Sequence, residues 1–235
     1  MKKIIIAILM TFGIFSMVSA DIGVKIGVTS QIGSLETSGK EVSSAGTTET
    51  SKTREAMLAT AGYFIEKDLA FLPGGLGRIG SRIHIGYDNI LHDLDLGTSN
   101  NVRSSTLGDA AGKGTEAAHS THSLTAEVTG FETVYATVNI TDWLYVKAGT
   151  VTVDVKTKFT GTATSKYANT HSLDGNVKGF GLIKATDTGW FTRLEYNDYD
   201  IDGKKVTNTG ADSKFSATLN DVSGSTARLS FGKAF

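Results

Sequence analysis

The sequence predicts an all-β protein, an eight-stranded antiparallel up-and-down transmembrane β-barrel. Apolar and polar residues alternate with a period of two in several segments, which is the pattern of strands with two unlike faces. Long polar connections and short turns alternate between those segments, as they do in membrane barrels. A mean hydropathy of −0.06 excludes a bundle of transmembrane helices.

The first twenty residues predict a signal peptide. Lys2 and Lys3 form a basic start, Ile4–Val18 is an apolar run, and small residues precede a cleavage site between Ala20 and Asp21. A signal-anchor helix is the alternative, but the run is shorter than the roughly 20 residues that span a bilayer. We therefore expect residues 1–20 to be removed and residues 21–235 to form the barrel domain.

Composition limits the partners. The 23 basic and 24 acidic residues nearly balance, which argues against nucleic acid as a partner because nucleic acid requires a basic patch. The chain has no cysteine, so its fold does not depend on disulfides.

Three strands are predicted in the N-terminal half: Gly23–Leu35, Met57–Ile65 and Arg78–Tyr87, separated by a polar loop at Thr37–Lys52, a turn at Pro73–Gly75 and a long polar loop at Asp88–Ala118. In the third of these, isoleucines share one face while Arg78 and Arg82 share the other.

Five strands are predicted in the C-terminal half: His119–Val138, Trp143–Lys156, Val177–Ala185, Trp190–Ile201 and Ser225–Phe235. Their connections are short turns at Asn139–Asp142 and Thr186–Gly189 and polar loops at Phe159–Thr170 and Asp202–Asp212. The apolar parity changes within the first of these strands, so we place a bulge near Gly130.

The last strand carries its apolar residues on one face and ends on an aromatic residue. Leu229, Phe231 and Phe235 alternate with small or polar residues, and Lys233 interrupts the apolar face. This pattern resembles the closing strand of bacterial outer-membrane β-barrels, in which the terminal aromatic is part of a signal for the barrel-assembly machinery. The family's usual aromatic at the third position from the end is Lys233 here.

The phrases NITDWLYVKAG and TDTGWFTRLEYNDYD resemble the small barrels of the OmpA, OmpX and opacity-protein type. The resemblance implies a monomer in the cell outer membrane, in contact with lipid and lipopolysaccharide and assembled with periplasmic chaperones. We expect no catalytic site and no cofactor. The enzyme alternative is an outer-membrane protease or lipase barrel, for which the chain is short and the catalytic constellation is missing. Surface contact, adhesion or phage attachment would then fall to four outer loops.

Nine charged residues fall on the predicted lumen side of the strands: Lys25, Arg78, Arg82, Glu127, Glu132, Lys147, Arg193, Glu195 and Arg228. Charges removed from bulk water must pair, and both signs are present. Because eight strands enclose a space just wide enough for side chains, we expect a plugged lumen.

Two further motifs are weak. Gly75–Gly80 spells the dinucleotide-binding GxGxxG, but we expect a strand after it where a nucleotide site needs a helix. Asp198, Asp200 and Asp202 resemble the start of a calcium loop, yet Thr209 stands at the closing position. They are a weak candidate for a divalent-cation or lipopolysaccharide-bridging site. The scattered histidines and the lack of GxSxG indicate neither a zinc site nor a hydrolase.

Three functions stay open at this point. The first is a structural or surface-interaction barrel with a plugged lumen. The second is a narrow porin-like channel for ions or small solutes. The third is a periplasmic lipocalin-like barrel, which would require an apolar interior and a polar exterior.

Overall fold

The computed structural model describes residues 22–42, 48–73, 75–91, 93–106, 117–160, 170–207 and 216–235. The predicted signal peptide and its cleavage site at Ala20 and Asp21 lie outside these residues. The elements are β1 (Val24–Val42), β2 (Thr48–Asp68), α2 (Gly75–Gly80), β3 (Ile83–Ile90), β4 (Leu94–Thr106), β5 (Ala117–Asn139), β6 (Leu144–Thr160), β7 (Thr170–Ala185), β8 (Trp190–Ile201), β9 (Lys204–Thr207), β10 (Ser216–Leu219) and β11 (Val222–Ala234).

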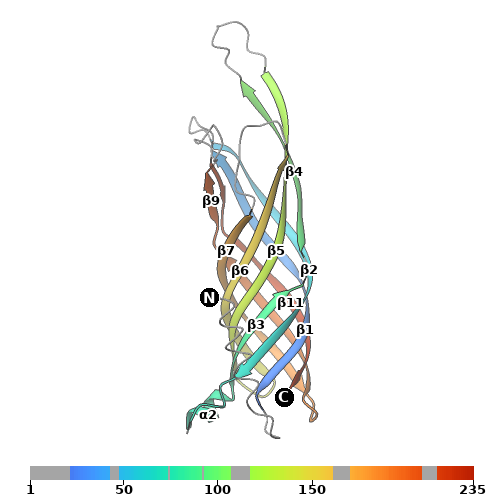
Figure 1. Cartoon of the computed structure of the whole chain (residues 1–235), viewed down its shortest axis with the longest axis vertical. Coiled ribbons are helices and arrows are strands. Elements are labelled where there is room, and N and C mark those ends of the chain that lie inside the picture. Colours follow the sequence, from blue (N-terminus) through green and yellow to red (C-terminus); the bar gives the residue numbers. More distant parts are fainter. Residues whose placement is uncertain are drawn as a thin grey trace.

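The sheet closes on itself into a barrel (Figure 1). β11 pairs with β1 from Lys25↔Ala234 to Glu36↔Ser223, and every pairing around the ring is antiparallel. Of the eleven strands, three pairs each occupy a single position in the ring, because the two members follow one another end to end. β3 and β4 both pair with β5, β10 and β11 both pair with β1, and β8 and β9 pair with β11 and β10. The ring therefore has eight strand positions, and the predicted fold class is confirmed.

The strands are longer than a membrane requires. β5 has 23 residues, β2 has 21, β1 has 19 and β6 has 17, whereas a tilted strand crosses the hydrocarbon in about 9–11 residues. Figure 1 shows these strands rising well above the crossed lower part of the barrel. The predicted loops at Thr37–Lys52 and Asp88–Ala118 were thus partly wrong, because β1, β2 and β4 continue into them by pairing with their hairpin partners.

Tight connections lie at the opposite end. The β7–β8 turn closes through Gly189, whose φ of 84° suits glycine, and Thr186 N donates a hydrogen bond to Trp190 O at 2.8 Å. The bulge expected near Gly130 is confirmed, because the register of β5 on β6 shifts between Val128 and Gly130.

The connection between β2 and β3 differs from the expected turn and strand. Residues Gly75–Gly80 form the short helix α2, and Leu69 N donates to Gly80 O at 3.0 Å and Ile83 O at 3.1 Å. A side chain at Gly77 or Gly80 would collide with backbone carbonyls of the facing segment, so these glycines permit the chain to fold back on itself. The glycines form the short helix themselves, and the next element is the strand β3 and not the helix that a nucleotide site needs. The expected strand therefore follows the motif, although it begins at Ile83 and not at Arg78.

The two faces of the wall exchange character along the barrel axis. On β1, the outward side chains Ile26, Val28 and Ile32 are apolar and exposed, whereas Glu36 and Lys40 further along the same face are charged and exposed. We call the part next to the tight connections, whose outward face is apolar, the basal half, and the part beyond the change the outer half.

Candidate functional site: the barrel interior

One strand shows a complete section through the interior. Along β8, the alternate residues from Phe191 to Ile201 are buried, and their outward neighbours, from Trp190 to Asp200, are exposed or partly so. The inward series begins with an aromatic ring, continues with Arg193 and Glu195, and ends with Tyr199 and Ile201. The interior therefore has a charged part in the basal half and an apolar part in the outer half.

The ion pair between Arg193 and Glu66 lies deepest in the charged part. Arg193 donates through Nη1 and Nη2 to the two carboxylate oxygens of Glu66, each at 2.5 Å, and both side chains are almost fully buried. Tyr135 Oη donates to Glu66 Oε1 at 2.8 Å. The guanidinium carbon lies 4.8 Å from the centroid of the Phe191 ring and 5.3 Å from that of Tyr145. Both charges are thus paired, and the cation is also covered by aromatic faces.

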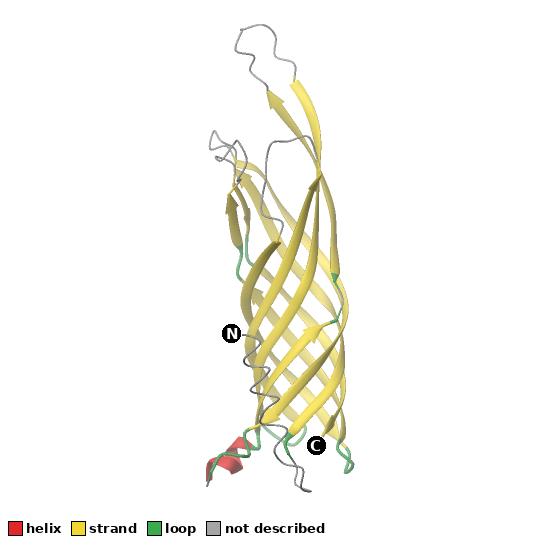
Figure 2. Ribbon diagram, viewed as in Figure 1, coloured by secondary structure: helices red, strands yellow, loops and turns green. Residues whose placement is uncertain are grey.

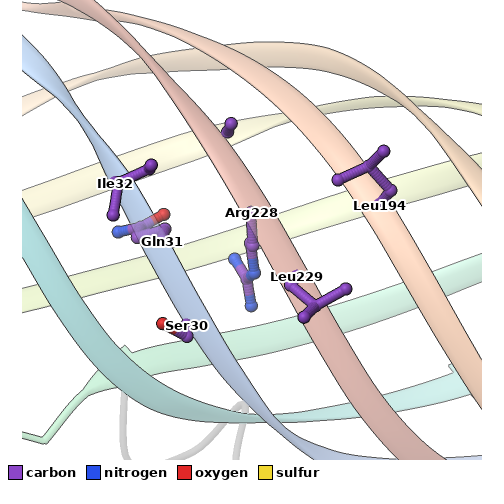
Figure 3. A pocket seen from close by; sticks show the side chains of 7 residues that line it. Ser30, Gln31, Ile32, Leu194, Arg228 and Leu229 are labelled. Carbon is purple, nitrogen blue, oxygen red and sulfur yellow. The ribbon is translucent and has the colours of Figure 1, made fainter.

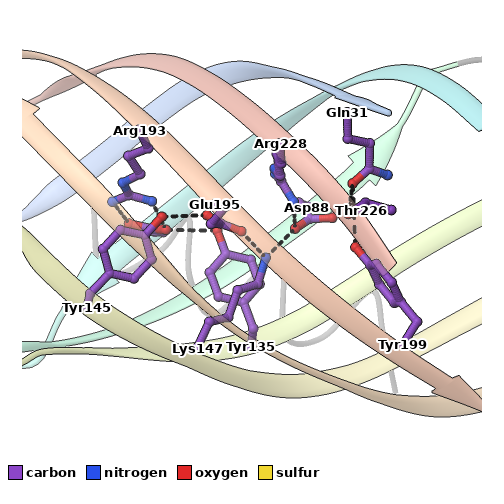
Figure 4. Close-up of polar contacts among 11 residues, drawn as sticks. Gln31, Asp88, Tyr135, Tyr145, Lys147, Arg193, Glu195, Tyr199, Thr226 and Arg228 are labelled. Atoms are coloured by element: carbon purple, nitrogen blue, oxygen red, sulfur yellow. Dashed lines mark hydrogen bonds and ion pairs between the residues drawn. The ribbon is translucent and has the colours of Figure 1, made fainter. Parts of the chain in front are cut away.

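Glu195 and Asp88 extend the charged part. Tyr145 Oη and Lys147 Nζ donate to the two oxygens of Glu195, at 2.7 and 3.0 Å. Arg228 Nη1 donates to Asp88 Oδ2 at 2.7 Å, and Lys147 Nζ approaches the same oxygen at 3.5 Å (Figure 4). Lys147 therefore bridges two carboxylates that come from different strands.

We call this set the lumen network; it consists of Glu66, Asp88, Tyr135, Tyr145, Lys147, Arg193, Glu195 and Arg228. Its three carboxylates and three cations balance in charge, and each of its tyrosines donates to a carboxylate. The members come from β2, β3, β5, β6, β8 and β11, so the network ties most of the barrel wall together.

Glycines make room for the two tyrosines. A side chain at Gly86 on β3 would collide with the Tyr135 ring, and one at Gly181 on β7 would collide with the Tyr145 ring. The rings lie across the lumen over these bare stretches of backbone and fill the section between the ion pairs. This arrangement explains why β7 contributes space and no charge to the network.

A polar layer separates the charged and apolar parts. Gln31 Oε1 lies 3.5 Å from both Tyr199 Oη and Thr226 Oγ1. Asn197, two residues before Tyr199 on β8, is fully buried. Beyond this layer the interior is an apolar core of Val128, Phe131, Val151, Val153, Leu173, Val177, Tyr199 and Ile201. The Phe131 and Tyr199 rings meet edge to face at 5.4 Å.

Five of the nine residues that the sequence placed in the lumen face inward: Lys25, Lys147, Arg193, Glu195 and Arg228. Lys25 Nζ lies 2.8 Å from His84 Nε2 near the base.

The remaining four residues were misplaced. Arg78 lies in α2 and Arg82 in the turn after it, and both are exposed because the segment is not a strand. Glu127 and Glu132 lie on the outward parity of β5, since Val128 and Phe131 are buried inside. The bulge was placed correctly, but the aromatic face of β5 turns inward toward the apolar core, which reverses the expected facing.

Glu66 and Asp88 are the carboxylates that sequence reasoning missed. Asp88 was assigned to a loop, although it continues the inward parity of His84 and Gly86 in β3. Glu66 follows Phe64 on the inward parity of β2, one residue beyond the predicted strand. Extending each predicted strand by one residue would have found them.

The acidic candidate for a metal site is not brought together. Asp198 and Asp200 lie on the outward face of β8, and Asp202 follows the strand. Within the described ranges, no three His, Cys, Asp or Glu side chains are grouped so that they could hold a metal ion. Asp198 lies opposite Lys178 in the register, which suits a solvated charge pair.

The predicted assembly residues lie on the outside of the closing strand. Leu229, Phe231 and Phe235 are exposed, and the Phe231 ring stacks on Trp190 at 5.1 Å with an interplanar angle of 12°. A shallow pocket lies nearby on the outward surface, lined by Ser30, Gln31, Ile32, Leu194, Ala227, Arg228 and Leu229 (Figure 3). The charged end of Arg228 is turned inward to Asp88, so this pocket is an apolar groove of the basal belt.

A closed antiparallel ring with an apolar belt outside and paired charges inside decides the architecture. The chain is an eight-stranded antiparallel up-and-down β-barrel of the transmembrane type. In the described part of the chain, no helix is long and apolar enough to span a membrane. Figure 2 shows that the wall itself consists of strands.

Comparison with known proteins gave structural matches alone; no family model and no curated sequence matches. The outer membrane protease OmpT from Escherichia coli matches at 9% identity and a TM-score of 0.46, over 94% of this chain and 99% of that one. Ail, the attachment invasion locus protein of Yersinia pestis, matches at 9% and 0.27, over 85% and 97%. Neisserial surface protein A matches at 8% and 0.26, over 84% and 95%. These distant likenesses add nothing to the fold established from strand pairing.

Proposed function

We propose that the protein is an integral outer-membrane barrel that holds a rigid, closed stalk above the membrane and acts through its outer connections. The observation that carries this proposal is the exchange of faces between the two halves. An apolar outward face suits lipid, and a polar outward face around an apolar core suits water. The basal half would thus be the anchor and the outer half a water-exposed extension.

The proposal includes a plugged lumen. In the basal half the lumen network pairs its charges across the interior, and in the outer half the apolar core fills the same axis. An ion would have to break buried ion pairs and then cross an apolar layer that offers no ligands. We therefore assign the protein an anchoring and surface-contact role without transport.

The four outer connections, β1–β2, β4–β5, β6–β7 and β9–β10, would meet the environment. Strands of 17–23 residues, at about 3.3 Å per residue and a tilt near 40°, reach roughly 40–60 Å along the axis, against an apolar belt of about 25 Å. That surplus would raise the connections above lipopolysaccharide sugars, where a partner surface or a phage could reach them. Export, assembly by the barrel machinery with periplasmic chaperones, and a monomeric state belong to the same proposal.

A narrow channel is the second candidate, and one observation favours it. Several buried polar atoms in the interior have no partner, among them Thr60 Oγ1, Thr133 Oγ1 and both amide atoms of Asn197. Such atoms are the usual sites of internal water, so the polar layer would be hydrated. The apolar core above this layer opposes a continuous water path. The basal half has the reverse of the faces that a lipocalin-like barrel requires.

Planar-bilayer recording separates the two candidates. Mature protein, inserted and shown to be folded by its heat-modifiable gel mobility, is expected to give no discrete conductance steps. The matched variant Val151→Gly with Val153→Gly opens the apolar core and leaves the lumen network intact. If the native protein conducts in steps that change with Arg228→Ala, the channel is correct and the plug is wrong.

A further inference from the structure

The segment between β2 and β3 is the largest connection at the basal end and has an unusual surface. The two other basal connections are tight turns, whereas this one runs from Leu69 to Arg82 and contains α2. Two large apolar side chains of α2 are exposed, Leu76 at 60% and Ile79 at 61%, and Phe71 before it is exposed at 58%. Exposed apolar side chains that gather in one segment beside polar residues can mark a contact surface for a membrane or a protein.

The same segment is basic. Arg78 and Arg82 are both exposed, and no acidic residue occurs between Asp68 and Asp88 in the sequence. Lys67 Nζ lies 5.4 Å from the centroid of the Phe71 ring, but it is paired with Asp68 Oδ1 at 2.7 Å, so Arg78 and Arg82 supply the net positive charge. Apolar and cationic side chains side by side on a short helix are typical of segments that lie in the headgroup region of an anionic membrane.

The segment is held in a fixed shape. Leu69 N bonds to Gly80 O and Ile83 O, Ser81 N donates to Gly77 O at 2.9 Å, and Ser81 Oγ donates to Arg78 O at 3.0 Å. Gly77 and Gly80 allow this close return, which gives the GxGxxG sequence a packing reason. Because the shape is already fixed, Leu76 and Ile79 stay exposed instead of folding back onto the barrel, and docking would cost little ordering entropy.

The position of the segment selects its partner. Figures 1 and 2 show α2 beside the base of the barrel, projecting sideways from the wall at the end where the C-terminus lies. β3 follows it directly, and Ile85 on that strand belongs to the outward apolar belt. Lys233 lies 5.5 Å from the Trp190 ring and 5.2 Å from the Phe235 ring, a further cation among aromatics on the basal outward surface. The α2 segment is therefore placed where a bilayer surface would meet the wall.

We propose that the α2 segment docks into the periplasmic leaflet, with Leu76 and Ile79 among the acyl chains and with Arg78 and Arg82 on anionic phospholipid headgroups. It would act as a lateral foot that fixes the height and tilt of the barrel. This inference rests on the proposed insertion of the barrel in a membrane, but it concerns a different surface from the lumen and the outer connections.

The absence of native cysteine allows a direct test. Leu76→Cys, labelled with an environment-sensitive fluorophore, is compared with Asp187→Cys, an exposed position in the β7–β8 turn at the same end. Both variants are refolded into phosphatidylcholine vesicles with or without phosphatidylglycerol and checked for heat-modifiable mobility. Ile79→Cys replaces Leu76→Cys if the first variant does not fold.

Lipids brominated in the acyl chain are expected to quench the label at position 76 and not at position 187. Phosphatidylglycerol should increase the quenching, and the double variant Arg78→Gln with Arg82→Gln should remove that increase. Each cation lost should lower the ratio of docked to exposed segment by about fivefold. Equal and weak quenching at both positions in a folded, inserted barrel would overturn the inference and leave this surface for a protein partner. Failure to insert would instead contradict the proposed function.

Discussion

In the basal half of this barrel the apolar side chains face outward, whereas in the outer half they face inward, although side chains alternate between the two faces in the same way throughout. On β6, Val146 faces outward and Lys147 inward in the basal half, whereas Thr152 faces outward and Val151 inward in the outer half. The strand does not bulge between these positions, so the parity continues while the chemistry of each face exchanges. A period of two therefore defines two faces, and the surrounding solvent decides which of them is apolar.

Removal of one partner from the deepest ion pair should have the largest effect on the basal half. Glu66→Ala leaves Arg193 buried without its carboxylate, and we expect a loss of about 3–5 kcal/mol in the free energy of unfolding. Urea titration in vesicles, followed by gel mobility, measures it. The double variant Glu66→Leu with Arg193→Leu should lose less than the single one; an equal or larger loss would show that the pair itself does not carry the effect.

An arginine on the outward face should locate the boundary between the halves. Val146→Arg places a charge in the apolar belt and should cost about 2–4 kcal/mol, whereas Thr152→Arg, three outward positions further along β6, should cost about 0–1 kcal/mol. The same urea titration applies. Similar costs at both positions would mean that the apolar environment extends over the outer half.

Truncation inside and outside the wall should separate packing from lipid contact. Leu173→Ala opens space in the apolar core and should cost about 2–3 kcal/mol. Leu182→Ala on the outward face of the same strand should cost less, because lipid refills the space. If the two substitutions cost the same, the outer half is not a packed core.

The smallest effect is expected at the acidic strand end. Asp198→Ala removes an outward carboxylate that lies opposite Lys178 in the strand register and should change stability by less than about 1 kcal/mol. Chelation of divalent cations should leave the unfolding midpoint unchanged. A fall in the midpoint on chelation, abolished by Asp198→Ala, would restore the cation site that the described geometry does not support.

Sequence reasoning succeeded where a strand has one clearly apolar face in the basal half. β8 and β11 fall into this class, and so Arg193, Glu195 and Arg228 were placed inward from their alternation with Leu194, Leu229 and other apolar residues. The number of strands around the barrel followed from the alternation of long and short connections. Both signals are local in the sequence, so they can be recognised without knowledge of contacts across the barrel.

It failed where the fold is decided by contacts across the barrel. Phe131 and Tyr135 look like lipid-facing residues, but they turn inward because the outer core and the space over Gly86 receive their rings. Arg78 and Arg82 continue the parity of β3 in the sequence, yet hydrogen bonds between Leu69 and residues 80 and 83 draw them into a helical connection. Neither outcome can be derived from one strand alone.

The exchange of faces is tested most directly by single cysteines along β6, from position 144 to 156, in vesicle-inserted protein. Outward positions up to Ala148 should be quenched by acyl-brominated lipid, and Thr152 and Lys156 should react with a water-soluble maleimide. Val151 and Val153, inside the apolar core, should resist both reagents. Lipid quenching that continues to Lys156, or a maleimide that reaches Val151 as readily as Thr152, would contradict a lipid-facing base beneath a closed, water-exposed outer half.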